Sequence, residues 1–146
     1  MLINTKYLGE IEISSDQILT FPQGLLGFES NHKFVLLSIP DNDHFKFLQD
    51  INNTYISFLL VNPWDFFEDY EINLPKEELL QIDIQSNENK PTIYNIVTLG
   101  KEFTESTGNL LAPIVLNLAD KKGKQFVLND ANYTTRHKLF TKELGE

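Results

Sequence analysis

The residues best suited to catalysis or metal binding are few and scattered in this chain of 146 residues. There are no cysteines, which removes thiolate metal sites, cysteine nucleophiles and disulfide frameworks from consideration. The histidines are His32, His44 and His137, and none is followed by a second histidine or a carboxylate three or four residues later, the spacing of a helical metal motif. We therefore predict no metal site and no cofactor, and expect surface or locally hydrogen-bonded histidines.

Motifs for nucleophilic or phosphate chemistry are also missing from the sequence. There is no G-x-S-x-G nucleophile elbow. Residues 21–28 (FPQGLLGF) hold two glycines three apart, but no Lys-Ser/Thr follows them, so a phosphate-binding loop is not indicated. Gly24 and Gly27 are better explained as turns that fold neighbouring apolar side chains back onto the core. A catalytic carboxylate pair is recognised by its separation in space, which a sequence does not give, and we predict no catalytic residues.

One segment is harder to explain by packing alone, because residues 61–71 (VNPWDFFEDYE) interleave four aromatic residues with four acids directly after a predicted buried strand. In one interpretation, Trp64, Phe67 and Tyr70 close one end of a barrel while the acids stay in water. In the other, the segment is a contact surface on which aromatic rings supply anchoring area and acids steer a basic partner. The two interpretations are compatible, since a residue at a rim can pack with one edge and bind with the other.

The overall charge favours a protein partner over nucleic acid. The formal net charge is −9 and the isoelectric point is about 4.7, whereas nucleic acid is bound by lysines and arginines that neutralise its phosphates. Residues 65–105 hold ten acids against three bases, so a cationic protein surface would be attracted there. The N-terminus lacks the basic and apolar regions of a signal peptide, and no apolar run reaches the ~20 residues of a membrane span. We expect a cytoplasmic protein that binds no nucleic acid and no membrane.

The elements that position these residues are predicted to be mostly strands. Short apolar runs rich in Val, Ile, Phe and Tyr are separated by Gly, Pro, Asn and Asp, a pattern typical of β structure. Period-two alternation on both sides of Gly9 predicts an opening hairpin over residues 3–13. Further strands are predicted at 34–39, 45–48, 55–61, 93–99, 114–118 and 125–128. A hairpin tip with solvated lysines is expected at 119–125, and a short helix at 76–82, where Pro75 suits the first turn.

The chain has no internal repeat, low-complexity linker or break in composition. We therefore predict one domain over residues 1–146, with a candidate flexible tail from about residue 141. The predicted fold class is mainly β, a single-domain antiparallel β-barrel-like fold with one or two short helices. There is no heptad seam, and a monomer is the expected state.

Five short motifs follow one another in order along the chain. They are Ile3–Ile11 (INTKYLGEI), Phe21–Phe28 (FPQGLLGF), Val61–Pro63 (VNP), Phe67–Tyr70 (FEDY) and Asn109–Ile114 (NLLAPI). Together they resemble the FliW family of flagellar assembly factors, over nearly the whole chain from Met1 to about Phe140. No single motif is diagnostic, whereas the ordered set is specific. We interpret the last motif mainly as strand and bend, with Pro113 at an edge or bulge.

The resemblance implies a non-enzymatic protein with two partners. Proteins of this family bind newly made flagellin in the cytoplasm, and they also bind CsrA, a small RNA-binding regulator that represses flagellin translation. Flagellin that accumulates occupies the protein and releases CsrA, and after flagellin is exported the protein sequesters CsrA again. The resemblance also implies a β-barrel-like fold, in agreement with the strand pattern. Such mutual exclusion needs either overlapping surfaces or two protein states, and the sequence does not choose between them.

Candidate contact residues follow as hypotheses. For CsrA, we predict an acidic cluster with aromatic anchors: Trp64, Asp65, Phe66, Glu68, Asp69 and Glu71. For flagellin, we predict residues beyond the last strand: Tyr133, Arg136, His137 and Phe140. The rival functions are a small-ligand-binding β-barrel domain and a small hydrolase with a carboxylate pair. A deep apolar pocket with convergent polar groups would favour a rival, and a filled barrel with an acidic patch outside would favour the protein-binding function.

Overall fold

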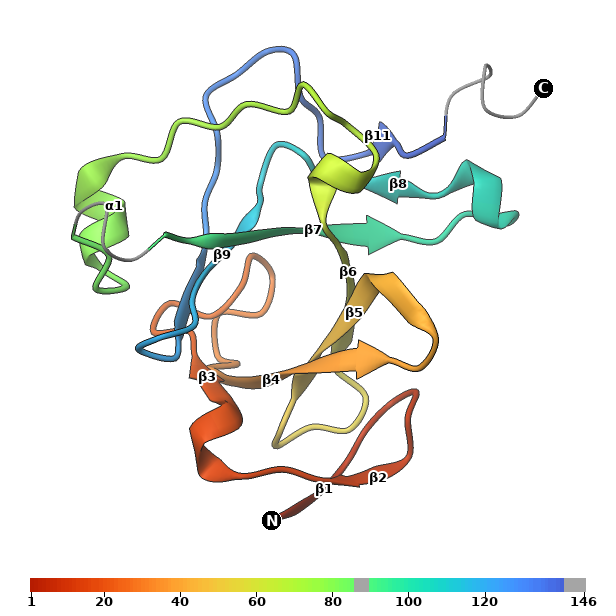
Figure 1. The fold of residues 1–146 in the computed structure, drawn as a ribbon, viewed down its shortest axis with the longest axis vertical. Helices are drawn as coiled ribbons and strands as arrows, with labels where there is room; N and C mark the ends of the chain where they lie inside the picture. Colours follow the sequence, from red (N-terminus) through yellow and green to blue (C-terminus); the bar gives the residue numbers. More distant parts are fainter. Residues whose placement is uncertain (86–89, 141–146) are drawn as a thin grey trace.

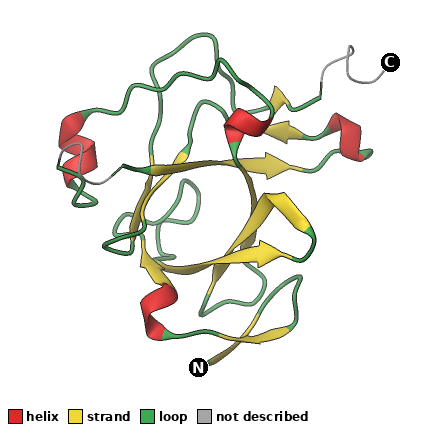
Figure 2. Cartoon of the chain, viewed as in Figure 1, coloured by secondary structure: helices red, strands yellow, loops and turns green. Residues whose placement is uncertain are grey.

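Seven strands of the computed structural model close into a barrel, which Figure 2 shows as a ring of strands. The structure describes residues 1–85 and 90–140. The barrel strands are β3 (Ile18–Thr20), β4 (Lys33–Ile39), β5 (Asn42–Asp50), β6 (Ser57–Val61), β7 (Thr92–Thr98), β9 (Ile114–Asn117) and β10 (Lys122–Gln125). Their order around the ring is β7-β6-β5-β4-β3-β10-β9, and β9 pairs back with β7 to close it (Figure 1).

The remaining elements decorate the ring. A separate hairpin pairs β1 (Leu2–Asn4) with β2 (Glu10–Glu12), while β8 (Thr107–Gly108) and β11 (His137–Lys138) extend the sheet beyond the end of β7. One α-helix, α1 (Lys76–Leu80), and three 3-10 turns, η1 (Ser15–Gln17), η2 (Pro63–Asp65) and η3 (Phe103–Glu105), complete the part of the chain that the structure describes. None of these helices is long and apolar enough to cross a membrane.

The ring has a thin seam between β3 and β10. Every other strand pairing in the described residues is antiparallel, but these two strands run parallel and meet at a single position, where Lys122 faces Thr20. The Thr20 N–H donates to the carbonyl oxygen of Lys121 (2.9 Å) at this seam. β3 and β10 are therefore held together mainly by their side chains inside the barrel.

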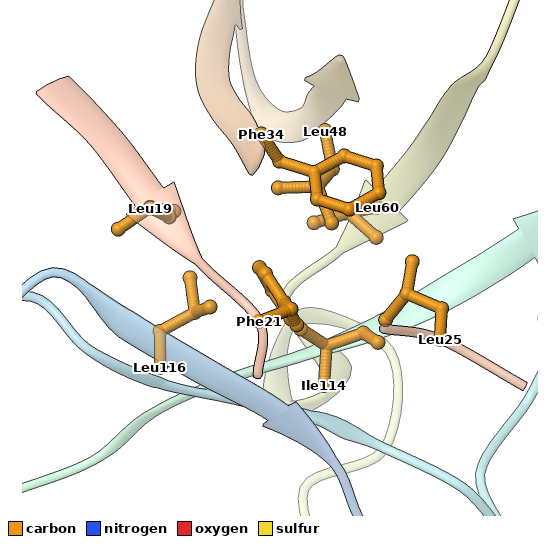
Figure 3. Packing of buried hydrophobic residues seen from close by; sticks show 8 residues of the cluster. All are labelled: Leu19, Phe21, Leu25, Phe34, Leu48, Leu60, Ile114 and Leu116. Carbon is orange, nitrogen blue, oxygen red and sulfur yellow. The ribbon is translucent and has the colours of Figure 1, made fainter. Parts of the chain in front are cut away.

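Those interior side chains form the main core. Alternate residues of a barrel strand point inward. Figure 3 shows eight converging interior side chains, six from barrel strands (Leu19, Phe34, Leu48, Leu60, Ile114 and Leu116) and two, Phe21 and Leu25, from the chain after β3. The Phe21 and Phe34 rings meet edge to face at 5.3 Å. Gly123 of β10 leaves room for this packing, because a Cβ atom there would lie 2.5 Å from the Phe21 ring. The interior of the barrel is filled with side chains rather than open to a ligand.

Besides a cluster of Tyr70, Leu110 and Leu128 at the candidate site, three further apolar clusters lie on the outer surface of the barrel. The β1–β2 hairpin covers β4, with Ile3 and Ile13 packed on Val35 and Leu37. The segment that includes α1 covers β7, β9 and the chain after β10, with a cluster of Ile82, Ile84, Ile93, Val115 and Phe126. The turn after β6 and the chain around β11 cover β5, β6 and β7, with a cluster of Phe45, Val61, Val97 and Leu139. The last of these layers carries the candidate site.

The predicted fold class is confirmed, and so is the opening hairpin. The predicted strand at 125–128 and hairpin tip at 119–125 were wrong, because β10 occupies Lys122–Gln125 and residues 126–128 follow it without regular strand structure. The lysines in this stretch are not all solvated, since Lys124 lies 3.1 Å from Glu78 with only 11% of its side chain exposed. The predicted tail from about residue 141 lies outside the described residues.

Candidate functional site

The acidic and aromatic segment begins as a tight turn at the end of β6. The Asn62 side chain accepts a hydrogen bond from the Trp64 N–H (3.0 Å), which caps η2, and Pro63 occupies the first position of the turn. The Phe66 and Phe67 N–H groups both donate to the carbonyl oxygen of Pro63. This local sequence turns the chain away from the barrel and places the following acids in solvent.

The structure brings the predicted CsrA-facing residues together on one surface. The four acids of the set are exposed, Trp64 is 39% exposed and Phe66 is half-buried. The Trp64 indole N–H donates to the carbonyl oxygen of Tyr70 (2.9 Å), so the ring is held in place while part of it faces water. The Asp65 carboxylate accepts a hydrogen bond at 3.0 Å from the exposed His44 ring.

Tyr70 anchors this surface to the rest of the fold. Its side chain is only 4% exposed. Its hydroxyl donates to the carbonyl oxygen of Leu110 (2.6 Å) and accepts from Nδ2 of Asn95 (3.3 Å). Burial disfavours the phenolate and raises the pKa of Tyr70 to about 12. Tyr70 is therefore packed inside the fold while the acids and Trp64 remain outside, and the contact-surface interpretation of the segment stays a prediction.

The predicted flagellin-facing residues lie against the same segment, beside η2 in Figure 1. The Phe67 and His137 rings are 5.2 Å apart, and the Phe66 and Phe140 rings are 5.5 Å apart, both edge to face. Tyr133 packs on Tyr70 at 4.8 Å, and its hydroxyl accepts a hydrogen bond from the Glu71 N–H (2.9 Å). Arg136, the remaining member of the predicted set, is exposed. Two groups of residues that are about 65 positions apart in the chain thus form one continuous surface.

Two shallow hollows mark this surface. The Phe66 hollow has a volume of about 450 Å³ and is lined by Phe66, Phe67, Glu68, Asp69, Tyr70, Leu110, Tyr133 and His137. The Trp64 hollow has a volume of about 410 Å³ and is lined by Trp64, Glu71, Ile72, Asn73, Leu128, Asn129 and Asp130. Both lie outside the barrel, between the chain after β6 and the chain after β10.

Several residues of this surface were not predicted from the sequence. Leu110 belongs to the motif at 109–114, which we interpreted mainly as strand and bend; residues 111 and 112 do form a bend and β9 begins at Ile114, whereas Leu110 lies in neither. The Leu110 carbonyl holds Tyr70, and the Leu110 N–H donates to Thr134 (3.1 Å). Phe103 of η3 is 52% exposed and lies 5.2 Å from the Phe140 ring. One sequence signal could have pointed to Leu110, namely that the motif at 109–114 is one of the five ordered motifs. No sequence signal pointed to Phe103.

Within residues 1–85 and 90–140, no group of three or more His, Asp or Glu side chains is arranged to hold a metal ion. Burial raises the pKa of the Tyr70 and Tyr94 phenols, which are uncharged at neutral pH even at the ordinary pKa of 10.0.

A filled barrel with an exposed acidic and aromatic surface defines a small β-barrel protein. Comparison with known proteins narrows this class. The chain belongs to the FliW family, because the family model described as FliW protein matches residues 2–139.

Curated relatives and a solved structure agree with this assignment. The chain is 40% identical over 146 residues to the flagellar assembly factor FliW of Geobacillus thermodenitrificans (strain NG80-2), with both chains fully covered. It is 39% identical over 142 residues to the protein of the same name from Bacillus subtilis (strain 168), covering 95% of this chain and 96% of that one. A crystal structure of the flagellar assembly factor FliW superposes with a TM-score of 0.90 at 40% identity, covering 98% of this chain and 99% of that chain.

Proposed function

We propose that this protein is a non-catalytic flagellar assembly factor that acts in the cytoplasm by binding two proteins, flagellin and the translational regulator CsrA. Its relatives carry the name flagellar assembly factor, and the resemblance of the sequence motifs supplies the two partners. By binding CsrA, the protein relieves repression of flagellin translation. The observation that carries the proposal is the single surface on which the two predicted sets of contact residues meet.

Charge supports CsrA as a partner of this surface. A regulator that holds RNA needs basic residues, and the exposed acids Asp65, Glu68, Asp69 and Glu71 present the complementary sign. Pairs of exposed charges are individually worth only about 0–1 kcal/mol. Their larger effect is on association, because a concentrated field of one sign steers the encounter and loses strength as salt is added.

The apolar part of the surface supports flagellin. The ends of flagellin chains form amphipathic helices, and such a helix needs an apolar groove on its receptor. The sequence did not locate a groove, and the Phe66 hollow is our candidate for it, because four half-buried rings, Phe66, Phe67, Tyr133 and His137, line it beside polar residues. Its acidic rim at Glu68 and Asp69 leaves room for the polar face of a helix in solvent.

Contact between the two sets favours direct competition as the basis of the switch. Mutual exclusion of two ligands requires overlapping surfaces or a change of protein state. Phe66 and Phe67 of the CsrA-facing segment touch Phe140 and His137 of the flagellin-facing segment. A partner that covers one segment therefore covers part of the other, and no second state of the protein is needed.

A charge-reversal pair with a matched control tests the CsrA assignment. We expect E68K/D69K to weaken CsrA binding in calorimetric titration, because it replaces two exposed acids of the surface. The control E10K/E12K changes the net charge equally on exposed positions of β2, in the hairpin at the opposite end of the molecule in Figure 1. Equal CsrA affinities for both folded variants would contradict the assignment. Absence of CsrA and flagellin binding to the folded wild-type protein at low salt would overturn the proposed function.

The small-ligand and hydrolase alternatives have less support. Both call for a deep pocket with convergent polar groups. The barrel interior is occupied by the eight residues of Figure 3, and the two hollows are open features of the outer surface.

A further inference from the structure

The Trp64 hollow has a composition that suits a cation. Its lining residues are one tryptophan, two acids and two amides, Trp64, Glu71, Asp130, Asn73 and Asn129, together with Ile72 and Leu128. An aromatic face attracts a cation through the ring quadrupole, carboxylates pair with it, and amide oxygens accept its remaining hydrogen bonds. The lining of the Phe66 hollow differs, because aromatic rings predominate there.

The indole ring is held in a fixed position. Its N–H is tied to the Tyr70 carbonyl oxygen (2.9 Å), its ring packs against the Tyr70 ring at 5.8 Å, and its backbone N–H is capped by Asn62. The ring is still 39% exposed. Binding of a partner to this ring therefore costs little conformational entropy of the Trp64 side chain, because the ring is already ordered.

The carboxylates of the hollow are available to a ligand. Oδ1 of Asp130 accepts from the Asn132 N–H (2.9 Å), which orients the side chain and leaves Oδ2 without a hydrogen bond from the described residues. Glu71 is exposed, and its backbone N–H is fixed by the Tyr133 hydroxyl. Within residues 1–85 and 90–140, neither carboxylate has a lysine, arginine or histidine within 4.0 Å. The described part of the chain supplies no counter-ion there.

We propose that the Trp64 hollow holds an arginine side chain of a protein partner, with its guanidinium on the indole and between Glu71 and Asp130. This inference rests on the proposed function, for which it names the anchoring chemistry of the acidic surface. Arginine fits better than lysine because its planar group stacks on an aromatic ring and offers five donors to carboxylate and amide oxygens, whereas an ammonium is a compact point charge. The hollow adjoins Glu71 of the predicted CsrA-facing set, so the arginine belongs to the basic partner.

The single tryptophan of the chain makes the hollow directly observable. The probe is N-acetyl-arginine amide, and the control ligand is N-acetyl-citrulline amide, which has nearly the same shape and no charge. We expect the arginine probe at millimolar concentrations to shift the Trp64 indole N–H resonance and change its fluorescence, and citrulline to do neither. D130N keeps the acceptor for Asn132 and removes the charge, so it should weaken arginine binding at least about tenfold. Equal responses to the two probes, or none to either, would overturn the proposal.

Titration with CsrA separates this inference from the proposed function. D130N and W64F should weaken CsrA binding at least about tenfold, whereas E12Q, which removes the same single charge from exposed β2, should not. If CsrA binds the wild type and all three folded variants equally, the hollow is not an anchor and the proposed function stands. If CsrA does not bind the folded wild type, the proposed function fails for this partner, and the comparison of the arginine and citrulline probes alone decides whether the hollow selects a guanidinium.

Discussion

Replacement of Tyr70 by phenylalanine should destabilise the protein by removing one buried hydroxyl. The hydroxyl donates to the carbonyl oxygen of Leu110 at 2.6 Å and accepts from Nδ2 of Asn95 at 3.3 Å. Tyr70 is only 4% exposed. Asn95 keeps a second bond to the carbonyl oxygen of Asn109 (2.6 Å), so the main loss falls on the Leu110 carbonyl. A buried acceptor left without its partner costs about 1–3 kcal/mol. We expect Y70F to lose this amount of unfolding free energy.

Urea unfolding followed by circular dichroism measures this loss. With an m value of about 2 kcal/mol/M, the midpoint should fall by about 0.5–1.5 M at unchanged slope. Y94F is the matched control, because it removes the same hydroxyl from a half-buried tyrosine. The Tyr94 hydroxyl makes no hydrogen bond to the described residues. Y94F should change stability by less than about 0.5 kcal/mol. If Y70F costs no more than Y94F, Tyr70 does not anchor the site in the way described.

Three further predictions concern pH, packing and salt. Burial raises the pKa of Tyr70 from 10.0 to about 12, so the unfolded chain loses this proton at a lower pH than the folded protein does. The stability of the wild type should therefore fall between pH 10 and pH 12. In urea unfolding over this pH range, the difference in stability between the wild type and Y70F should narrow. G123A places a Cβ atom 2.5 Å from the Phe21 ring and should cost about 1–3 kcal/mol in the same assay at neutral pH, and an unchanged midpoint would contradict the packing. The affinity that E68K/D69K loses for CsrA should shrink in calorimetry between 0.1 M and 1 M salt, where the Debye length falls from about 10 Å to about 3 Å, and a constant loss would argue against steering by charge.

Five of the seven barrel strands were predictable because each carries its own local pattern, whereas β3, which has only three residues, was not predicted. Alternation around Gly9 predicted the β1–β2 hairpin, and the apolar runs predicted β4 to β7 and β9 within a few residues. β10 was missed because its residues, KGKQ, have the composition of a solvated turn. Its strand conformation depends on long-range contacts, the Phe21 ring against Gly123 and the ion pair between Lys124 and Glu78.

The candidate site was predictable in its parts and not in its assembly. The acids and Trp64 were identified from their unusual mixture, and the mixture is indeed exposed. The contact between this segment and residues 133–140 depends on β8 and β11, which are two residues long and too short to show a periodic pattern. Tyr70 and Leu110 are 40 positions apart in the sequence, and closure of the barrel brings them into contact. Only the structure could show that both predicted surfaces are one.

The measurement that tests this shared surface most directly is titration of flagellin into the protein at several fixed concentrations of CsrA. Direct competition predicts that the apparent flagellin affinity falls in proportion to the free CsrA concentration without reaching a limit, and that no complex of all three proteins forms. A plateau in the apparent affinity, or a ternary complex that elutes as one species in size-exclusion chromatography, would contradict the account and place the two partners on separate surfaces.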